Sequence, residues 1–156
     1  MNKIAVFPGS FDPFTVGHES IVNRASLLFD KIYIAIGFNP KKDALFSLDE
    51  RKAFINQVFD TNPKIEVIHF EGLTINVCKD VNASYILRGL RTAADFEYER
   101  AIAQVNKAMH HGIETVFFLT MPEHTPVNSS IVRDILRHGG DASQFIPLKM
   151  NMKKFK

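Results

Sequence analysis

The chain has 156 residues, of which 46% are hydrophobic and 23% are charged. This length fits one domain, and the composition supplies a core and excludes a mainly disordered chain. The 19 Lys and Arg residues exceed the 17 Asp and Glu residues by two, giving a net charge of +2. So small an excess predicts no nucleic-acid partner, and any anion must be bound by a local cluster of cations.

Cysteine content and the apolar runs bear on location. The single cysteine, Cys78, cannot form an internal disulfide, which fits a reducing cytoplasm. The first apolar run stops at Pro8-Gly9, too early for a signal-peptide core. No run approaches the ~18 apolar residues of a membrane span. We therefore expect a cytoplasmic protein with no membrane partner.

Hydrophobic periodicity predicts strands and helices in alternation. The helix over 95–111 carries apolar residues at helical spacing, and Ser47 with Glu50 has the spacing of a capping box. The predicted strands are Lys3–Phe7, Lys31–Phe38, Lys64–Phe70, Ser84–Leu87 and Glu114–Thr120, and the predicted helices are Gly17–Phe29, one starting at Ser47, Leu73–Val81, Asp95–His111 and Ser129–His138.

This alternation predicts right-handed βαβ crossovers, hence an α/β fold with a parallel sheet and helices on both faces. We expect a single domain over residues 1–156, with a basic tail from about residue 149 that frays or packs late. In such sheets, ligands bind beyond the carboxyl ends of the strands, where the strand order reverses. The loops that follow strands are therefore the places to search for chemistry.

The loop after the first strand contains Gly9, Ser10, Gly17 and His18. Glycine permits close backbone approach to a ligand, and His18 falls in the first turn of the next helix, where an anion is favoured. The alternative to a ligand-binding loop is an ordinary tight turn followed by a histidine at the start of a helix. Two glycines, a hydroxyl group and a histidine within ten residues after a strand favour the ligand-binding loop. The glycine spacing matches neither the dinucleotide fingerprint nor the P-loop.

Arg88 and Arg91 follow the fourth strand and form a fork suited to phosphate oxygens. The alternative is a pair of surface salt bridges with acidic residues of the next helix: Asp95, Glu97 or Glu99. We favour phosphate binding, because the pair stands at a strand end.

Two further loops carry cationic or hydroxyl groups. Lys42 follows the second strand, and residues 124–130 follow the fifth. The latter loop ends in Asn128, Ser129 and Ser130, which could simply cap a helix or could also hold phosphates. Together, the strand-end loops predict a polyphosphate substrate. No set of residues has zinc spacing, and Cys78 is expected in the core.

The segments Gly9–Pro13 and Thr15–His18 resemble the nucleotidylyltransferase signature. Leu87–Arg91 with Asp95–Glu99 is similar to bacterial phosphopantetheine adenylyltransferases in particular, and the similarity runs from Lys3 to about Pro147. The resemblance implies adenylyl transfer from ATP to 4′-phosphopantetheine, giving dephospho-coenzyme A and pyrophosphate. It also implies a Rossmann-like sheet in the order 3-2-1-4-5, Mg²⁺, a homohexamer and feedback inhibition by coenzyme A.

The resemblance also implies residue roles. The implied catalytic residues are His18, Lys42 and Arg91, and the implied phosphopantetheine contacts are Ser10, Lys42, Thr74 and Arg88. The implied ATP contacts are Ser10, Phe11, His18, Gly89, Leu90, Arg91, Glu99, His124, Thr125, Pro126, Val127, Asn128, Ser129 and Ser130. Residues 124–127 depart from the family pattern, so only their backbone is expected to make contacts.

The implied mechanism is one in-line displacement, in which the acceptor phosphate attacks the α-phosphorus and His18 stabilises the developing charge. A sister enzyme acting on glycerol phosphate or nicotinamide mononucleotide is one alternative. A nucleotide-binding sensor without turnover is another.

Overall fold

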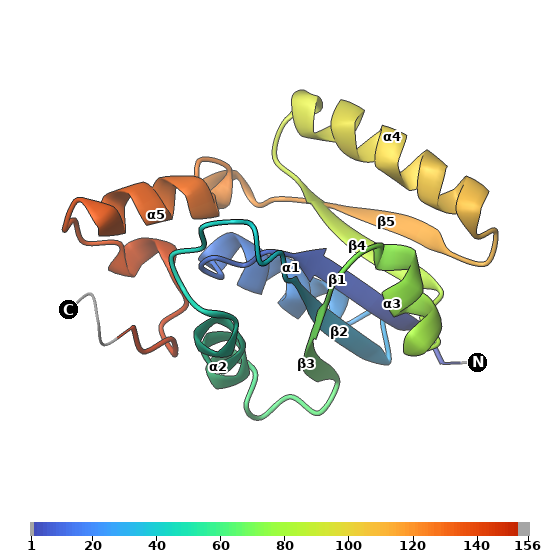
Figure 1. The fold of residues 1–156 in the computed structure, drawn as a ribbon, viewed down its shortest axis with the longest axis horizontal. Coiled ribbons are helices and arrows are strands. Elements are labelled where there is room, and N and C mark those ends of the chain that lie inside the picture. Colours follow the sequence, from blue (N-terminus) through green and yellow to red (C-terminus); the bar gives the residue numbers. More distant parts are fainter. Residues whose placement is uncertain (1, 153–156) are drawn as a thin grey trace.

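The computed structural model describes residues 2–152, which contain one five-stranded parallel sheet in the order β3-β2-β1-β4-β5 (Figure 1). The strands are β1 Ile4–Gly9, β2 Lys31–Gly37, β3 Ile65–Phe70, β4 Tyr85–Leu90 and β5 Glu114–Leu119. This order confirms the predicted Rossmann-like fold. The reversal lies between β1 and β4, so their carboxyl ends are neighbours.

Helices cover both faces of the sheet, as predicted (Figure 1). They are α1 Val16–Ala25, α2 Leu48–Val58, α3 Thr74–Asp80, α4 Ala93–Met109 and α5 Ser129–Arg137, with short 3₁₀ helices at Pro122–His124 and Ser143–Phe145. Side chains of β1 alternate between two cores, because successive strand residues point to opposite faces. Ala5 and Phe7 pack with α1, α2 and α5, whereas Val6 packs with α3.

Capping boxes fix the starts of three helices. The predicted box at Ser47 and Glu50 begins α2. Thr15 with His18 caps α1 in the same way, and Thr92 with Asp95 caps α4. The sequence reading missed the Thr15 box because histidine is not the acidic or amide residue expected at its third position. As a consequence, the backbone locks His18 into the first turn of α1.

Two predicted strand ends were wrong. β1 extends through Gly9 rather than stopping at Phe7, and β4 extends through Leu90 rather than stopping at Leu87. Arg88 and Gly89 therefore lie within β4, where the ladder places them opposite residues of β5. The neighbouring strands keep pairing past the apolar run, and sequence periodicity does not report that pairing. The backbone from which the Arg88 side chain projects is therefore held in the sheet and is not part of a loop.

The apolar stripe of α4 is exposed. Tyr98 is 70% exposed, Val105 56% and Met109 46%. Glu99 is the one buried residue of this helix within residues 2–152. The predicted helix is thus confirmed, but its apolar residues do not pack into the core of the single chain.

The described part of the C-terminal tail packs against α2. Met150 and Met152 are buried in the larger core. Lys149 Nζ lies 2.8 Å from Asp60 Oδ1, and the Asn151 amide donates to Gln57 Oε1 over 2.9 Å. Residues 149–152 therefore do not fray, whereas residues 153–156 lie outside the described residues.

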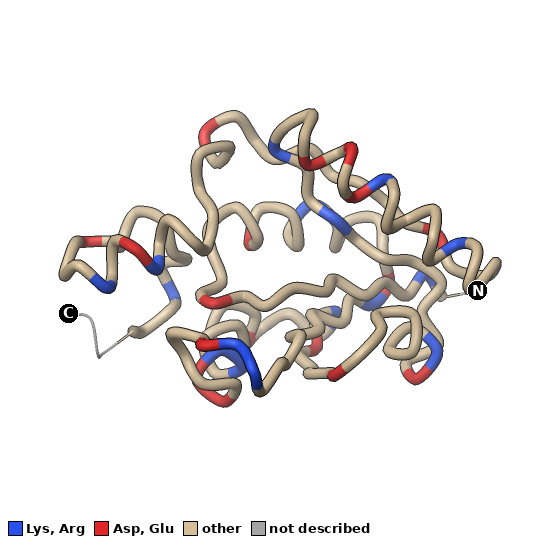
Figure 2. Tube along the Cα trace, turned by 45° about the horizontal axis from the view of Figure 1, so that its top comes forward, with Lys and Arg blue, Asp and Glu red and all other residues tan. Residues whose placement is uncertain are grey.

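Charge is mixed along the trace. Figure 2 shows Lys and Arg positions interspersed with Asp and Glu positions over most elements, which agrees with the small net charge. Within the described residues, none of the helices has the length and apolarity that crossing a membrane requires.

The close contact between β4 and α1 generates a first prediction. A Cβ at Gly89 would lie 2.4 Å from Cδ1 of Ile21. Gly89→Ala should therefore lower the free energy of unfolding by about 1–3 kcal/mol, the usual cost of overpacking. Ile21→Val removes that Cδ1 atom. Gly89→Ala should therefore lower the free energy of unfolding clearly less in the Ile21→Val protein than in wild type. Urea unfolding of both single variants and the double variant measures this, and strict additivity would contradict it.

Candidate active site

A cavity of about 320 Å³ opens at the carboxyl ends of β1 and β4. The loop after β1, the first turn of α1, the end of β4 and the start of α5 form its walls. Sequence-predicted residues in its lining are Ser10, Phe11, His18, Arg88, Gly89, Arg91, Glu99, Val127, Asn128 and Ser129. The reversal in strand order thus brings together groups that are more than 100 residues apart in the chain.

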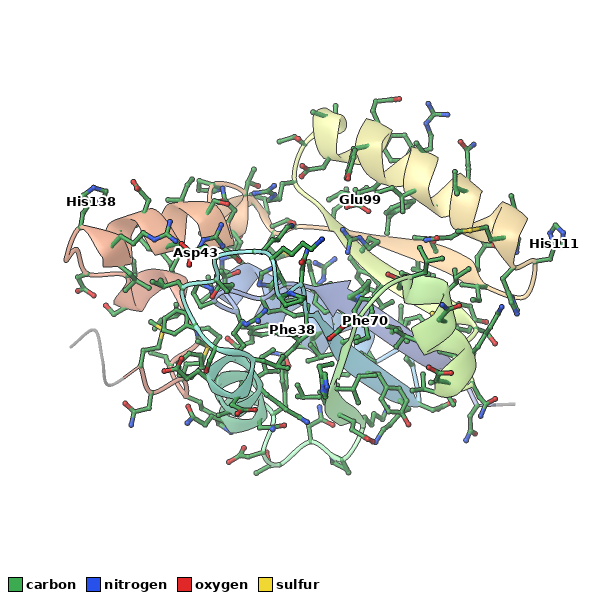
Figure 3. The ribbon with its side chains drawn as sticks, viewed as in Figure 1. Phe38, Asp43, Phe70, Glu99, His111 and His138 are labelled. Atoms are coloured by element: carbon green, nitrogen blue, oxygen red, sulfur yellow. The ribbon has the colours of Figure 1, made fainter. Side chains whose placement is uncertain are left out.

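A second cavity, of about 910 Å³, adjoins the first and shares Ser10 and Arg88 with it. Its lining also includes Lys42 and Thr74, so all four implied phosphopantetheine residues lie there. Phe38 and Phe70, at the ends of β2 and β3, and Asp43, on the loop after β2, belong to the same lining (Figure 3). One cavity therefore contains implied ATP contacts, and the other contains the implied acceptor contacts.

Five implied ATP contacts are absent from the lining of both cavities: Leu90, His124, Thr125, Pro126 and Ser130. Leu90 is buried. His124 ends the short helix Pro122–His124, and Thr125 is its C-terminal cap. The Ser130 hydroxyl accepts from Arg133 Nη2 at 3.1 Å. The binding roles of these residues stay predictions.

The His18 ring is held by a backbone amide and by aromatic rings. The Thr15 N–H donates to His18 Nδ1 over 3.0 Å. The His18 ring centroid lies 5.1 Å from that of Phe11, 5.2 Å from Phe14 and 6.1 Å from Phe7. Because Nδ1 accepts a hydrogen bond, a neutral ring carries its proton on Nε2.

Burial, and after it the positive charges of Arg91 and Arg88, together lower the pKa of His18 to about 4. The ring is therefore neutral at pH 7, and its Nε2–H is a hydrogen-bond donor rather than an acid with a full charge. A donor of this kind can stabilise negative charge that builds on a phosphate oxygen.

Both arginines form ion pairs and also line the first cavity. Arg88 Nε donates to Glu99 Oε2 over 2.7 Å, its Nη2 bonds Glu99 Oε1, and its Nη1 donates to the Pro8 carbonyl over 2.8 Å. Glu99 lies on the side of α4 that faces the sheet (Figure 3). Arg91 Nε lies 3.2 Å from Asp95 Oδ2. The carboxylates thus orient the guanidinium groups. The ion pairs with α4 that the sequence offered as an alternative are therefore present, and they are compatible with phosphate binding by the same arginines.

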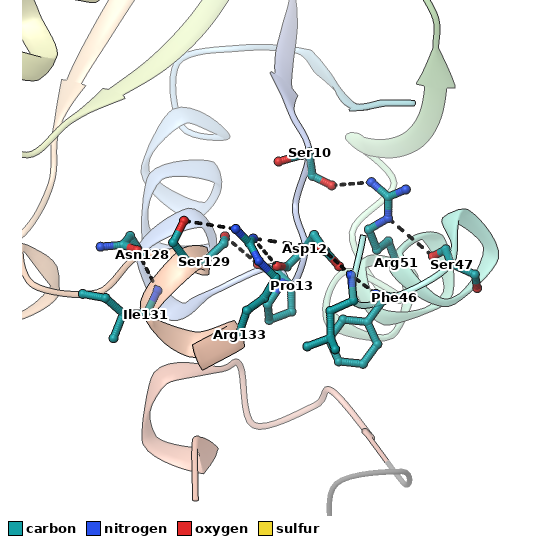
Figure 4. Close-up of polar contacts among 12 residues, drawn as sticks. Ser10, Asp12, Pro13, Phe46, Ser47, Arg51, Asn128, Ser129, Ile131 and Arg133 are labelled. Atoms are coloured by element: carbon teal, nitrogen blue, oxygen red, sulfur yellow. Dashed lines mark hydrogen bonds and ion pairs between the residues drawn. The ribbon is translucent and has the colours of Figure 1, made fainter. Parts of the chain in front are cut away.

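Sequence reasoning missed three buried or half-buried residues that hold the loop after β1: Asp12 within the loop, and Arg51 and Arg133 on the helices beside it (Figure 4). Asp12 was visible only as part of the Gly9–Pro13 motif. Arg51 and Arg133 lie on helices, where a lone arginine is typical of a solvated face. No local pattern reveals that each guanidinium group reaches a carbonyl of this loop.

Cys78, His111 and His138 line neither of the two cavities. Cys78 is buried, and that burial raises the pKa of its thiol to about 11, which makes it a poor nucleophile. His111 and His138 lie at opposite ends of the molecule (Figure 3). Residues 2–152 contain no group of three His, Cys, Asp or Glu side chains placed to hold a metal ion.

Comparisons with known proteins identify the family. The cytidylyltransferase-like family matches residues 6–135. The chain is 53% identical over 150 residues to phosphopantetheine adenylyltransferase of Flavobacterium johnsoniae, covering 96% of this chain and 98% of that protein. The chain belongs to the phosphopantetheine adenylyltransferase family. Another family member, from Cytophaga hutchinsonii, is 47% identical over 150 residues, covering 96% of this chain and all of that one. The resemblance drawn from the sequence is confirmed.

A solved structure shares the fold of this chain. It is assigned as a nicotinate-nucleotide adenylyltransferase from Vibrio parahaemolyticus. The two chains align with a TM-score of 0.71 at 17% identity, over 96% of each chain.

The environment of His18 predicts an unusual titration. Its imidazole resonance should titrate near pH 4 in the folded, ligand-free protein, and a midpoint near pH 6.5 would contradict the half-buried, neutral ring. The unfolded ring titrates at about 6.5. Between these values the unfolded state binds more protons, so this residue's contribution to stability falls as the pH drops from 6.5 toward 4.

His18→Asn is a matched variant, because the amide oxygen can still accept from the Thr15 N–H. The difference in the free energy of unfolding between wild type and variant should therefore shrink as the pH falls through this window. Urea unfolding at several pH values measures it.

Proposed function

We propose that this chain transfers the adenylyl group of ATP to 4′-phosphopantetheine, giving dephospho-coenzyme A and pyrophosphate. The adjoining cavities that share Ser10 and Arg88 carry this proposal, because two anionic substrates could meet at that shared wall. The names of the relatives support the choice of acceptor. The neutral His18 favours an enzyme over a sensor, since a pure binder needs no donor at the reacting phosphorus.

In the proposed mechanism, an oxygen of the acceptor phosphate attacks the α-phosphorus of ATP. The bond from that phosphorus to the bridging oxygen breaks, and pyrophosphate leaves with the electron pair. Lys42 and Arg88 hold the acceptor, while Arg91 and the start of α5 hold the triphosphate. His18 Nε2–H donates to an α-phosphate oxygen. Alignment of the two reactants could supply about 7–11 kcal/mol.

We also propose that Mg²⁺ accompanies ATP and neutralises part of its charge. The carboxylates in the first cavity, Asp95 and Glu99, are both bonded to arginines. This donor set fits an ion held chiefly by phosphate oxygens and water, as Mg²⁺ often is. Asp95 and Glu99 would then be outer neighbours of the ion.

The choice of acceptor is tested by pyrophosphate release with ATP and a panel of acceptors. 4′-Phosphopantetheine should give turnover well above glycerol phosphate and nicotinamide mononucleotide. A higher rate with either of the other two would reassign the enzyme. ATP binding without pyrophosphate release from any acceptor would indicate a sensor.

Lys42 and Lys41 form a matched pair for locating the acceptor site. Both are exposed, but Lys42 lines the second cavity and Lys41 does not. Lys42→Ala should weaken phosphopantetheine binding about 10-fold or more and ATP binding little, because a cation facing a phosphate is lost. Lys41→Ala should change neither. Titration calorimetry measures both affinities, and equal losses for the two ligands would contradict the assignment.

We further propose that the protein is a cytoplasmic homohexamer that coenzyme A inhibits. The exposed stripe of Tyr98, Ile102, Val105 and Met109 on α4 supports self-association, because a row of apolar side chains gains by being covered. Inhibition by coenzyme A would follow from its phosphopantetheine arm, which shares the acceptor's chemistry. The buried free thiol of Cys78 fits a reducing compartment.

The α4 stripe gives a direct test of assembly. Val105→Glu places a charge in the middle of the stripe and should reduce the mass observed by analytical ultracentrifugation at micromolar concentration. Arg100→Glu on the same helix, outside the stripe, is the control and should leave the mass unchanged. An unchanged mass for Val105→Glu would show that another surface mediates assembly.

A further inference from the structure

The loop after β1 is held in a strained conformation. Phe11 has a φ of +47°, in the left-handed region that residues with a Cβ rarely adopt. Such a conformation persists only where surrounding contacts fix it. Ser10 lines both cavities, and Phe11 lines the first of them. The contacts that fix this turn therefore bear on the reacting groups.

Two arginines fix the turn on either side of Phe11 (Figure 4). Arg51 of α2 donates through Nη1 to the Ser10 carbonyl over 2.8 Å. Arg133 of α5 donates through Nη1 to the Asp12 carbonyl over 2.7 Å. Burial lowers the pKa of Arg51, and the nearby Asp12 carboxylate opposes that shift. Asp12 thus lies between the two cations that hold its own loop.

The buried Asp12 carboxylate in turn holds the segment that carries Lys42. Its Oδ2 accepts from the Leu45 N–H over 2.8 Å, and its Oδ1 accepts from the Phe46 N–H over 2.9 Å. These amides lie three and four residues after Lys42, at the end of the loop from β2 to α2. Each carboxylate oxygen of Asp12 thus accepts a hydrogen bond from a different backbone amide.

We propose that Asp12 is a positioning residue for adenylyl transfer: it ties the Lys42 loop to the Ser10–Phe11 turn and so sets the acceptor phosphate against the α-phosphorus of ATP. This proposal rests on the proposed function. A carboxylate suits the task because both of its oxygens accept hydrogen bonds, whereas an asparagine offers one oxygen and one N–H₂ group. Asp12→Asn would leave one of the two amides facing a donor. The Lys42 loop would loosen, while the carbonyl bonded by Arg133 would remain.

The test compares kinetics and binding of Asp12→Asn with those of wild type. The variant should lose about 10- to 100-fold in kcat/KM for phosphopantetheine, the scale expected when a reactant is misplaced by about 1 Å. Its affinity for ATP should change less than about threefold. Asp30→Asn is the matched control, because Asp30 also joins two segments by accepting an amide N–H, from Lys3 over 2.8 Å. Asp30 lies at the amino ends of β1 and β2, opposite the end of the sheet that carries the cavities, and Asp30→Asn should leave kcat/KM unchanged.

A double-mutant cycle shows whether Asp12 acts through Lys42. In a Lys42→Ala background, Asp12→Asn should cost less than about threefold in kcat/KM, because the side chain it positions is already gone. The same full loss in both backgrounds would mean that Asp12 supports the fold generally, and would overturn the proposal. A matching fall in ATP affinity would overturn it as well.

Hydrogen exchange of the wild-type protein gives a readout that needs neither the variant nor turnover. The Leu45 and Phe46 amides should exchange at least tenfold more slowly than those of the exposed neighbours Asp43 and Ala44. Equal, fast exchange would overturn the proposal even if Asp12→Asn fails to fold. If the acceptor panel rejects phosphopantetheine while these amides stay protected, the proposed function fails but the tie between the two loops stands.

Discussion

The carboxyl ends of β1 and β4 lie side by side because the sheet grows in opposite directions from β1. This juxtaposition places the loop after β1 next to the arginines at the end of β4. One crossover after β1 leads to β2 and the Lys42 loop, while the later strands lead to α4 and α5. Side chains from the β1 loop, the β2 loop, the end of β4 and the start of α5 therefore lie around the turn that follows β1.

The proposed function requires the site to hold two anions close together, although the chain as a whole has a net charge of only +2. Arg88 and Arg91 are already paired with carboxylates before any ligand binds. These pairs reduce the free positive charge, but they fix the orientation of the guanidinium groups. Preorganised donors lose little entropy on binding, which compensates for the partly neutralised field.

His18 and Asp12 are both enclosed by the fold, but they take opposite hydrogen-bonding roles. His18 is enclosed by aromatic rings and lies close to two cations, so it is neutral and its Nε2–H can donate a hydrogen bond. Asp12 is buried, and each of its two oxygens accepts a hydrogen bond from a backbone amide. In this way the fold places one donor in the lining of the first cavity and uses one acceptor to join the loops after β1 and β2.

The sequence by itself determined the alternation of elements, the strand-end loops and the family, because hydrophobic periodicity and contiguous motifs such as Gly9–Pro13 are local. It could not place Arg51 or Arg133, since their carbonyl partners lie 41 and 121 residues away. It also predicted an apolar face on α4 without revealing that the face is exposed in the single chain. Burial, strand pairing beyond the apolar run and the protonation state of His18 depend on packing between distant segments, which only the tertiary structure decides.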